Sequence, residues 1–182
     1  AYLKRLAIKP GQNMLIHGAS GSIGSSAVQL AKYLGLEVTA VCGTKNVELV
    51  KSLGADEVID YKTKDFTAIN KTFDYVFDAV GKSSYFTCKH LMKEHGLFFA
   101  TDFGKNFENV WLTILKIKSS GKKVTFPLPK ENKEDIMLFT RLAEEGKLRP
   151  VIDRYYTMEE IPDAYRYALT EQKTGTLVVR VV

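Results

Sequence analysis

The sequence is poor in cysteine, histidine and long apolar runs, and each shortage excludes a class of protein. Cys42 and Cys88 are the only cysteines, so neither a disulfide framework nor a four-cysteine zinc lobe is possible. His17, His90 and His95 have no metal-ligand spacing with one another or with either cysteine, so we assign them structural roles and predict no metal site. No run approaches the ~20 apolar residues of a membrane span, and no secretory leader is recognisable. We therefore predict a cytoplasmic protein without a membrane partner.

Charge is spread along the chain and is not concentrated in blocks. The 26 basic and 21 acidic residues leave a net charge of +5. This pattern is typical of a solvated basic surface and does not indicate a nucleic-acid partner, although it would suit a phosphorylated small ligand. With 45% hydrophobic residues over 182 positions, the chain is long enough for one domain with a sizeable core.

Short apolar runs alternate with longer segments of helical period, which predicts βαβ units. Several runs are apolar nearly throughout, as expected of strands covered by helices on both faces. We predict an α/β Rossmann-type fold, doubly wound, with a parallel six-stranded sheet. The predicted strands span residues 14–17, 37–42, 57–60, 75–79, 97–101 and 123–126.

The predicted helices have recognisable beginnings and ends. After the first strand, apolar residues recur at helical spacing from Ile23 to Leu34, and Gly35 follows as a C-terminal cap. Asn46 is the expected N-cap of the next helix, which stops at Gly54. A proline-rich segment at residues 126–129 is the clearest break in the chain. Further helices are predicted at residues 83–93, 109–119, 133–145 and 158–169, the last with a capping-box spacing between residues 157 and 160.

A glycine-rich loop between the first strand and the first helix is the sharpest functional signal. Residues 19–24 read Ala-Ser-Gly-Ser-Ile-Gly, the dinucleotide fingerprint with alanine in its first position. Gly21 lets the main chain approach a pyrophosphate, and Gly24 lets helix and strand pack closely. The amides near Ser22 and Ile23 would face the phosphates at a helix N-terminus. The loop as a whole predicts dinucleotide binding by Ala19, Ser20, Gly21, Ser22, Ile23 and Gly24.

The end of the second strand favours NADP(H) over NAD(H). NAD-binding domains place an acidic residue there for the adenosine ribose, whereas this chain has Gly43, Thr44 and Lys45. Lys45 would attract a 2′-phosphate and Thr44 could donate a hydrogen bond to it. The alternative is that Lys45 is an ordinary surface lysine that opens a helix.

Tyr85 and Lys89 form a Tyr-x-x-x-Lys pair, which short-chain dehydrogenases use as an acid/base pair. There the pair follows the fifth strand, but here it follows the fourth, about 60 residues after the glycine loop. We therefore do not assign it a catalytic role.

Taken together, six segments resemble the medium-chain dehydrogenase/reductase superfamily, and within it the zinc-independent quinone oxidoreductase branch related to zeta-crystallin. The likeness covers nearly the whole chain. The segments that carry it are residues 9–12, 19–24, 52–61, 78–81, 146–153 and 175–179.

The resemblance implies further site residues. Tyr61 would join Thr44 and Lys45 around the 2′-phosphate, although it could also be an ordinary aromatic residue at a strand end. Val80 and Gly81 would run along the nicotinamide ribose, together with Phe103 and Gly104 after the fifth strand. No catalytic residue is assigned.

The resemblance also implies a longer parent protein. Family members begin with a GroES-like β-rich domain that forms most of the substrate pocket, and nothing of that kind precedes Ala1 in this sequence. We expect residues 1–182 to be an NADP(H)-binding domain, inactive alone, whose parent transfers hydride from NADPH to a quinone or α,β-unsaturated carbonyl. The final strand, residues 177–182, would run toward the other domain, and the sixth strand would pair across a homodimer axis. The alternatives are the cofactor domain of a zinc-dependent alcohol dehydrogenase and a non-catalytic NADPH-binding or sensor module.

Overall fold

A parallel six-stranded sheet is the centre of the molecule. The computed structural model describes residues 3, 6–104, 107–114, 121–126 and 132–181. The strands are β1 Asn13–His17, β2 Glu37–Cys42, β3 Glu57–Asp60, β4 Phe73–Asp78, β5 Met92–Ala100 and β6 Lys123–Thr125. They lie in the order β3-β2-β1-β4-β5-β6, and every neighbouring pair is parallel. The order reverses between β1 and β4, so the predicted doubly wound fold is confirmed.

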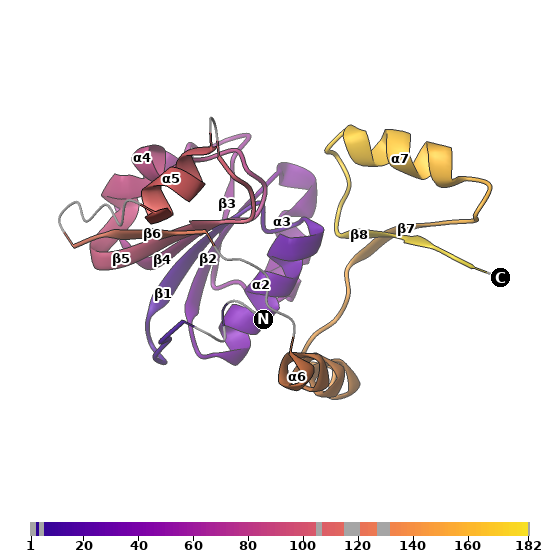
Figure 1. The fold of residues 1–182 in the computed structure, drawn as a ribbon, viewed down its shortest axis with the longest axis horizontal. Coiled ribbons are helices and arrows are strands. Elements are labelled where there is room, and N and C mark those ends of the chain that lie inside the picture. The colour runs from indigo at the N-terminus through magenta and orange to yellow at the C-terminus, as the bar shows by residue number, and fades with distance from the viewer. Residues whose placement is uncertain (1–2, 4–5, 105–106, 115–120, 127–131, 182) are drawn as a thin grey trace.

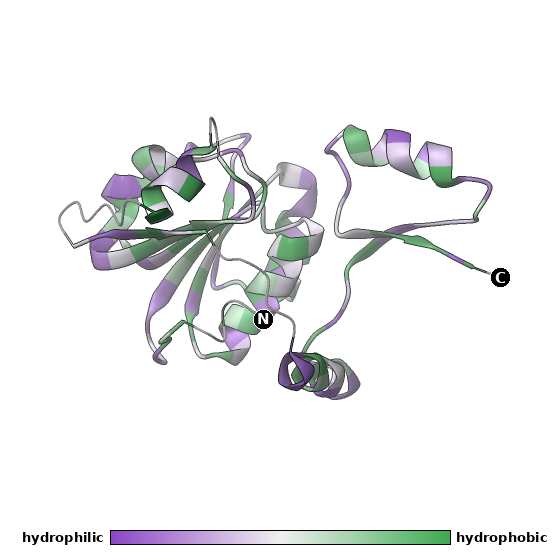
Figure 2. Ribbon diagram, viewed as in Figure 1, coloured by the Kyte–Doolittle hydropathy of each residue, from purple (hydrophilic) through white to green (hydrophobic). Residues whose placement is uncertain are grey.

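Helices cover both faces of this sheet (Figure 1). On one face lie α2 Ser22–Tyr33 and α3 Val47–Ser52, and on the other lie α4 Tyr85–Cys88 and α5 Glu108–Ile114. Successive side chains of a strand point to opposite faces, so Met14 and Ile16 join the α2/α3 core whereas Leu15 joins the α4/α5 core. The apolar strands between polar outer helix faces are visible in Figure 2.

A second, smaller unit follows the sheet domain. Helix α6 Lys133–Glu144 leads to β7 Ile152–Tyr156, then α7 Ile161–Leu169, then β8 Thr176–Val179. β7 and β8 pair in parallel as a separate two-stranded sheet. β7 was not predicted, because its Ile-Asp-Arg-Tyr-Tyr run has no apolar alternation, and the structure shows that the strand is largely exposed. The predicted final strand is present but begins at Thr176 and ends at Val179.

The predicted helix at residues 83–93 was wrong in its second half. The α-helix ends at Cys88, a 3-10 turn Lys89–Leu91 follows, and Met92 already pairs with Phe73 at the start of β5. The register of this pairing then shifts before Tyr75, and His95 takes a positive φ of 66°. Because this irregularity interrupts the strand, the sequence pattern did not indicate that β5 begins as early as Met92.

Two other helix predictions need adjustment. Helix α5 ends at Ile114 within the described residues, and positions 115–119 of the predicted helix lie outside them, as does the proline segment at 127–129. Helix α7 begins at Ile161 with Pro162 in its first turn. Of the predicted capping box only one half forms, with the Glu160 carboxylate accepting a hydrogen bond from the Thr157 amide at 2.8 Å.

Candidate cofactor-binding site

The glycine loop turns tightly between β1 and α2. Gly18 has a φ of 78°, and a Cβ atom placed on it would stand 2.7 Å from Cβ of Val80. A Cβ atom on Gly24 would overlap the carbonyl oxygen of Gly18. Helix, loop and the segment after β4 are therefore in direct contact, and only glycine fits at both positions.

The first turn of α2 presents backbone N–H groups beside this loop, where Gly21 also forms an isolated parallel bridge with Gly175. The first bond of the helix runs from the Ser25 amide to the carbonyl of Gly21 at 2.9 Å. The amides of Ser22, Ile23 and Gly24 come before it, and the first amides of a helix have no acceptor four residues back. No acidic residue lies in this turn. With the positive end of the helix dipole added, the residues present fit a bound diphosphate.

The residues predicted to surround a 2′-phosphate gather at the ends of β2 and β3. The Tyr61 amide donates to the Cys42 carbonyl at 3.0 Å, and a Cβ atom on Gly43 would stand 3.2 Å from the Tyr61 hydroxyl. The Tyr61 ring therefore packs against Gly43, and half of its surface remains exposed. Thr44 opens a 3-10 turn directly after this glycine.

Gly43, Thr44 and Tyr61, at the ends of β2 and β3, are here called the rim. Lys45 lies beside the rim, but its side chain already has a hydrogen-bond partner. Its Nζ donates to the backbone carbonyl of Gln172 at 2.7 Å. Asn46 is the N-cap residue of α3, as predicted, but its side chain does not cap the helix. Its Oδ1 instead accepts a hydrogen bond from the Thr174 hydroxyl at 2.9 Å. Both contacts join the rim to a segment 127 or 128 residues further along the chain.

That segment, residues 171–176, is here called the strap. It follows α7 and descends along the sheet domain beside α3 and α2 (Figure 1). The Gly175 amide donates to the Ser20 carbonyl at 2.8 Å, and the Ser22 and Thr176 hydroxyls are 2.7 Å apart. The strap was not predicted to lie at the site, because the residues in these contacts are far apart in sequence.

Asp78, at the end of β4, holds the loop that carries Val80 and Gly81. It is fully buried, and its Oδ1 accepts hydrogen bonds from the amides of both residues at 3.0 Å. Its Oδ2 accepts from the amide and hydroxyl of Ser83 at 2.7 and 2.9 Å. The His17 ring lies beside it, with Nδ1 3.3 Å from Oδ1. Burial acts to raise the pKa of Asp78, but His17 and the amide donors outweigh it and hold the pKa below the usual value.

Phe103 and Gly104 lie next to this loop, as the topology requires. A Cβ atom on Gly81 would stand 2.6 Å from Oδ2 of Asp102, so the segments after β4 and β5 touch. The buried Asn109 steadies the second segment by donating to the Asp102 carbonyl at 3.1 Å. Phe103 itself is exposed. The structure thus brings the predicted nicotinamide-side residues together at one edge of the sheet.

Tyr85 and His17, two of the residues that were given no role in catalysis or metal binding, are buried. Tyr85 is 1% exposed, and burial raises the pKa of its phenol, so it is not placed for proton transfer with a substrate. His17 is buried at a strand end, stacked on Phe66 with ring centroids 4.6 Å apart. Among the described residues, no group of three or more His, Cys, Asp or Glu side chains could hold a metal ion. The same part of the chain contains no helix of the length and apolarity that crossing a membrane demands.

The fold and the loop define a Rossmann-type domain of the kind that binds the cofactor in medium-chain dehydrogenases. A family model described as zinc-binding dehydrogenase matches residues 53–179. The chain therefore belongs to this family, within the medium-chain dehydrogenase/reductase superfamily.

Relatives and solved structures agree with this assignment. The chloroplastic quinone oxidoreductase QR1 of Triphysaria versicolor is 36% identical over 176 residues, which are 93% of this chain and 53% of the relative. The mitochondrial NAD(P)H oxidoreductase RTN4IP1 of Mus musculus is 31% identical over 192 residues, which are 94% of this chain and 48% of the relative. The solved quinone oxidoreductase of Coxiella burnetii superposes with a TM-score of 0.87 at 29% identity, over 99% of this chain and 56% of that one. The chain thus spans about half the length of the relatives it matches.

Proposed function

We propose that this chain binds NADP(H). The observation that carries the proposal is the glycine loop at the start of α2, whose first-turn amides lie near the end of β2, where Gly43, Thr44 and Lys45 stand in place of an acidic residue. Ser22 and Ile23 would donate to the diphosphate, while Thr44, Lys45 and Tyr61 would surround the 2′-phosphate. Lys45 would exchange the neutral carbonyl of Gln172 for a charged phosphate oxygen, which forms the stronger hydrogen bond.

For the complete protein we propose an NADPH-dependent, zinc-independent reductase of quinones or α,β-unsaturated carbonyls. The nicotinamide, when bound, supplies the hydride, and the protein places it and excludes competing reactions. Asp78 would contribute by holding the amides of Val80 and Gly81 in position beside the nicotinamide ribose. Quinone oxidoreductases from a plant and a bacterium among the similar proteins support this reading. The relatives' names point to chloroplasts and mitochondria, so a cytoplasmic location stays a prediction.

Two surfaces support the proposed domain and oligomer arrangement. Tyr155, Tyr165 and Leu169 in the β7-α7-β8 unit are large and at least half exposed, which fits packing against a substrate domain that precedes this one. Among the described residues, β6 is the last strand of the sheet, which fits pairing of its outer edge across a homodimer axis.

A titration of the 182-residue chain with NADPH and NADH tests cofactor binding. Calorimetry should show binding of NADPH and a weaker response to NADH. Absence of binding by both would overturn the proposal, and preference for NADH would overturn its specificity part.

Assays of the complete protein distinguish the candidate activities. NADPH consumption should occur with quinones or enones and should survive a chelator. Chelator-sensitive consumption with alcohols or aldehydes would instead establish the second candidate, a zinc alcohol dehydrogenase, which the description of the matching family favours. Binding without turnover on any panel would indicate a sensor module.

A further inference from the structure

An ion pair joins the strap to the loop after β4. Glu171, the first strap residue, takes a positive φ of 57°, and its Oε2 lies 2.6 Å from Nζ of Lys82. Both side chains remain more than half exposed. A solvated pair of this kind contributes little to folding stability, so its position matters more than its strength.

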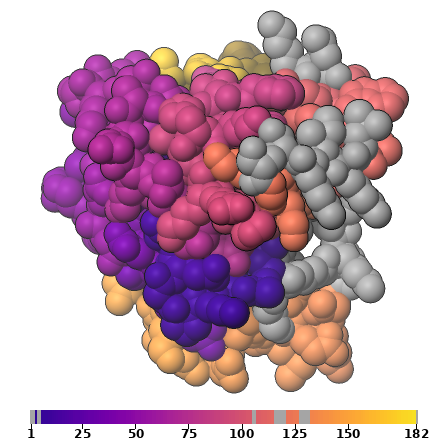
Figure 3. Space-filling view, turned by 90° about the vertical axis from the view of Figure 1, so that its left-hand side faces the viewer, coloured from indigo at the N-terminus to yellow at the C-terminus, as the bar shows by residue number. Residues whose placement is uncertain are grey.

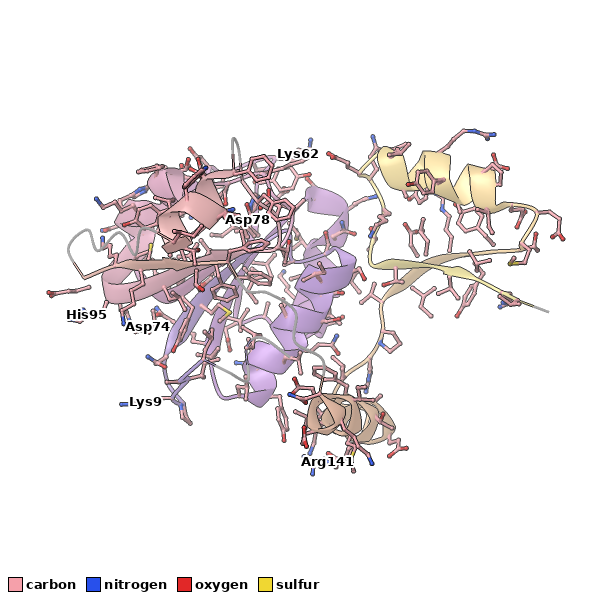
Figure 4. All side chains as sticks on the ribbon, viewed as in Figure 1. Lys9, Lys62, Asp74, Asp78, His95 and Arg141 are labelled. Carbon is pink, nitrogen blue, oxygen red and sulfur yellow. The ribbon has the colours of Figure 1, made fainter. Side chains whose placement is uncertain are left out.

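The pair stands at the rim where the 2′-phosphate is proposed to bind. Glu171 is the neighbour in sequence of Gln172, whose carbonyl accepts the hydrogen bond from Lys45. Lys82, on the other side, directly follows Gly81, and the pKa of its ammonium is raised first by Glu171 and more weakly by Tyr61. Glu171, Lys45 and Lys82 therefore share the rim with the tyrosine and with its neighbours in sequence, Asp60 and Lys62. Figure 4 shows Lys62, the residue after Tyr61, at the edge of the sheet domain that faces the end of α7.

The charges at this rim have opposite effects on a bound phosphate, because the lysines attract it and Glu171 repels it. A phosphate monoester carries about −1.5 to −2 charges at neutral pH, so a nearby carboxylate repels it. Glu171 also forms an ion pair with the Lys82 ammonium. Without this pair, Lys82 could bind the phosphate as a second cation beside Lys45. The unphosphorylated ribose of NAD(H) is neutral and is affected far less.

From this geometry we propose that Glu171 is a specificity-determining residue that weakens binding of the 2′-phosphorylated dinucleotide. It does so by repelling the phosphate and by keeping Lys82 in an ion pair, so that Lys82 does not bind the phosphate. The inference rests on the proposed binding of NADP(H) by this chain. It predicts a cofactor preference that the strap can tune without any change in the glycine loop.

The experiment compares two small probes that differ at the 2′ position, adenosine 2′,5′-bisphosphate and ADP, by calorimetry on the 182-residue chain. Glu171→Gln should bind the bisphosphate about 3- to 10-fold more tightly, as expected for removal of one partly screened charge, and ADP unchanged. Glu171→Asn, whose side chain tolerates a positive φ well, serves as a second variant. Lys82→Met combined with Glu171→Gln should abolish the gain. NADPH and NADH titrations of the same variants should follow the two probes.

Glu145→Gln is the matched control, because Glu145 forms a similar exposed pair with Lys147 at 2.7 Å. It directly follows α6, at the lower edge of the molecule in Figure 3, whereas α7, in yellow, lies at the upper edge. An equal gain in Glu145→Gln would reduce the effect to net charge and overturn the inference. So would equal tightening of both probes, or a gain that survives Lys82→Met. If unmodified chain binds neither NADPH nor NADH, the proposed function fails and the inference with it, whereas binding with an unchanged preference in the variants refutes the inference alone.

Discussion

Gly24 packs so closely on the carbonyl oxygen of Gly18 that no side chain fits between them. The obstacle is backbone, which cannot move aside as a flexible side chain would. We expect Gly24→Ala to lower the free energy of unfolding by about 1–3 kcal/mol or more, as overpacking in a core does. Urea denaturation of the 182-residue chain measures this, and an unchanged midpoint would contradict the tight packing of α2 on the loop.

Gly21 offers the contrast within the same motif. A Cβ atom there would make only an ordinary contact, 3.5 Å from the Gly18 carbonyl oxygen, and its φ of −76° suits any residue. Gly21→Ala should therefore cost less than about 1 kcal/mol of stability, the loss of a favourable N-cap. Its methyl group would still obstruct the approach of a diphosphate to the main chain. Calorimetry should show NADPH binding largely lost in a folded protein, and full affinity would show that the loop does not hold the cofactor.

Lys45→Ala tests the preference between the two cofactors. Because the ammonium would bind a charged phosphate oxygen, its removal should weaken NADPH binding by about 1.5–3 kcal/mol and leave NADH almost unchanged. Lys51→Ala is the control, since this exposed lysine on α3 pairs with Glu48. Equal losses for both cofactors would show that Lys45 acts only through its contact with the strap.

The sequence predicted those parts of the site whose signals are local. Neighbouring residues are enough to identify the glycine loop, the strand ends and the lack of an acidic residue after β2. The structure brings the loop and the strand ends together at one edge of the sheet. The strap could not be found this way, because Lys45 and Gln172 are 127 positions apart. Asp78 is an intermediate case. Its local pattern is an aspartate at a strand end, followed by Gly81 and Ser83. Only the structure shows that its carboxylate accepts hydrogen bonds from the amides of these two residues.

Asp78 gives a pH-dependent prediction whose sign follows from its depressed pKa. A carboxyl group that is more acidic in the folded protein stabilises it above the unfolded pKa of about 3.9, and this contribution disappears as the pH falls through the folded pKa. Asp78→Asn should therefore lower the free energy of unfolding at about pH 7 by about 1.5–3 kcal/mol, the range for hydrogen bonds to a charged group. The difference from the unmodified chain should narrow as the pH is lowered below about 4, because Asp78 takes up a proton in the unfolded chain there while it is still ionised in the folded protein. Urea titrations of both proteins across this range measure the effect, with Glu145→Gln as the exposed-carboxylate control. A gap that stays constant with pH would mean that Asp78 acts through shape alone and that its charge does not hold the Val80–Gly81 loop.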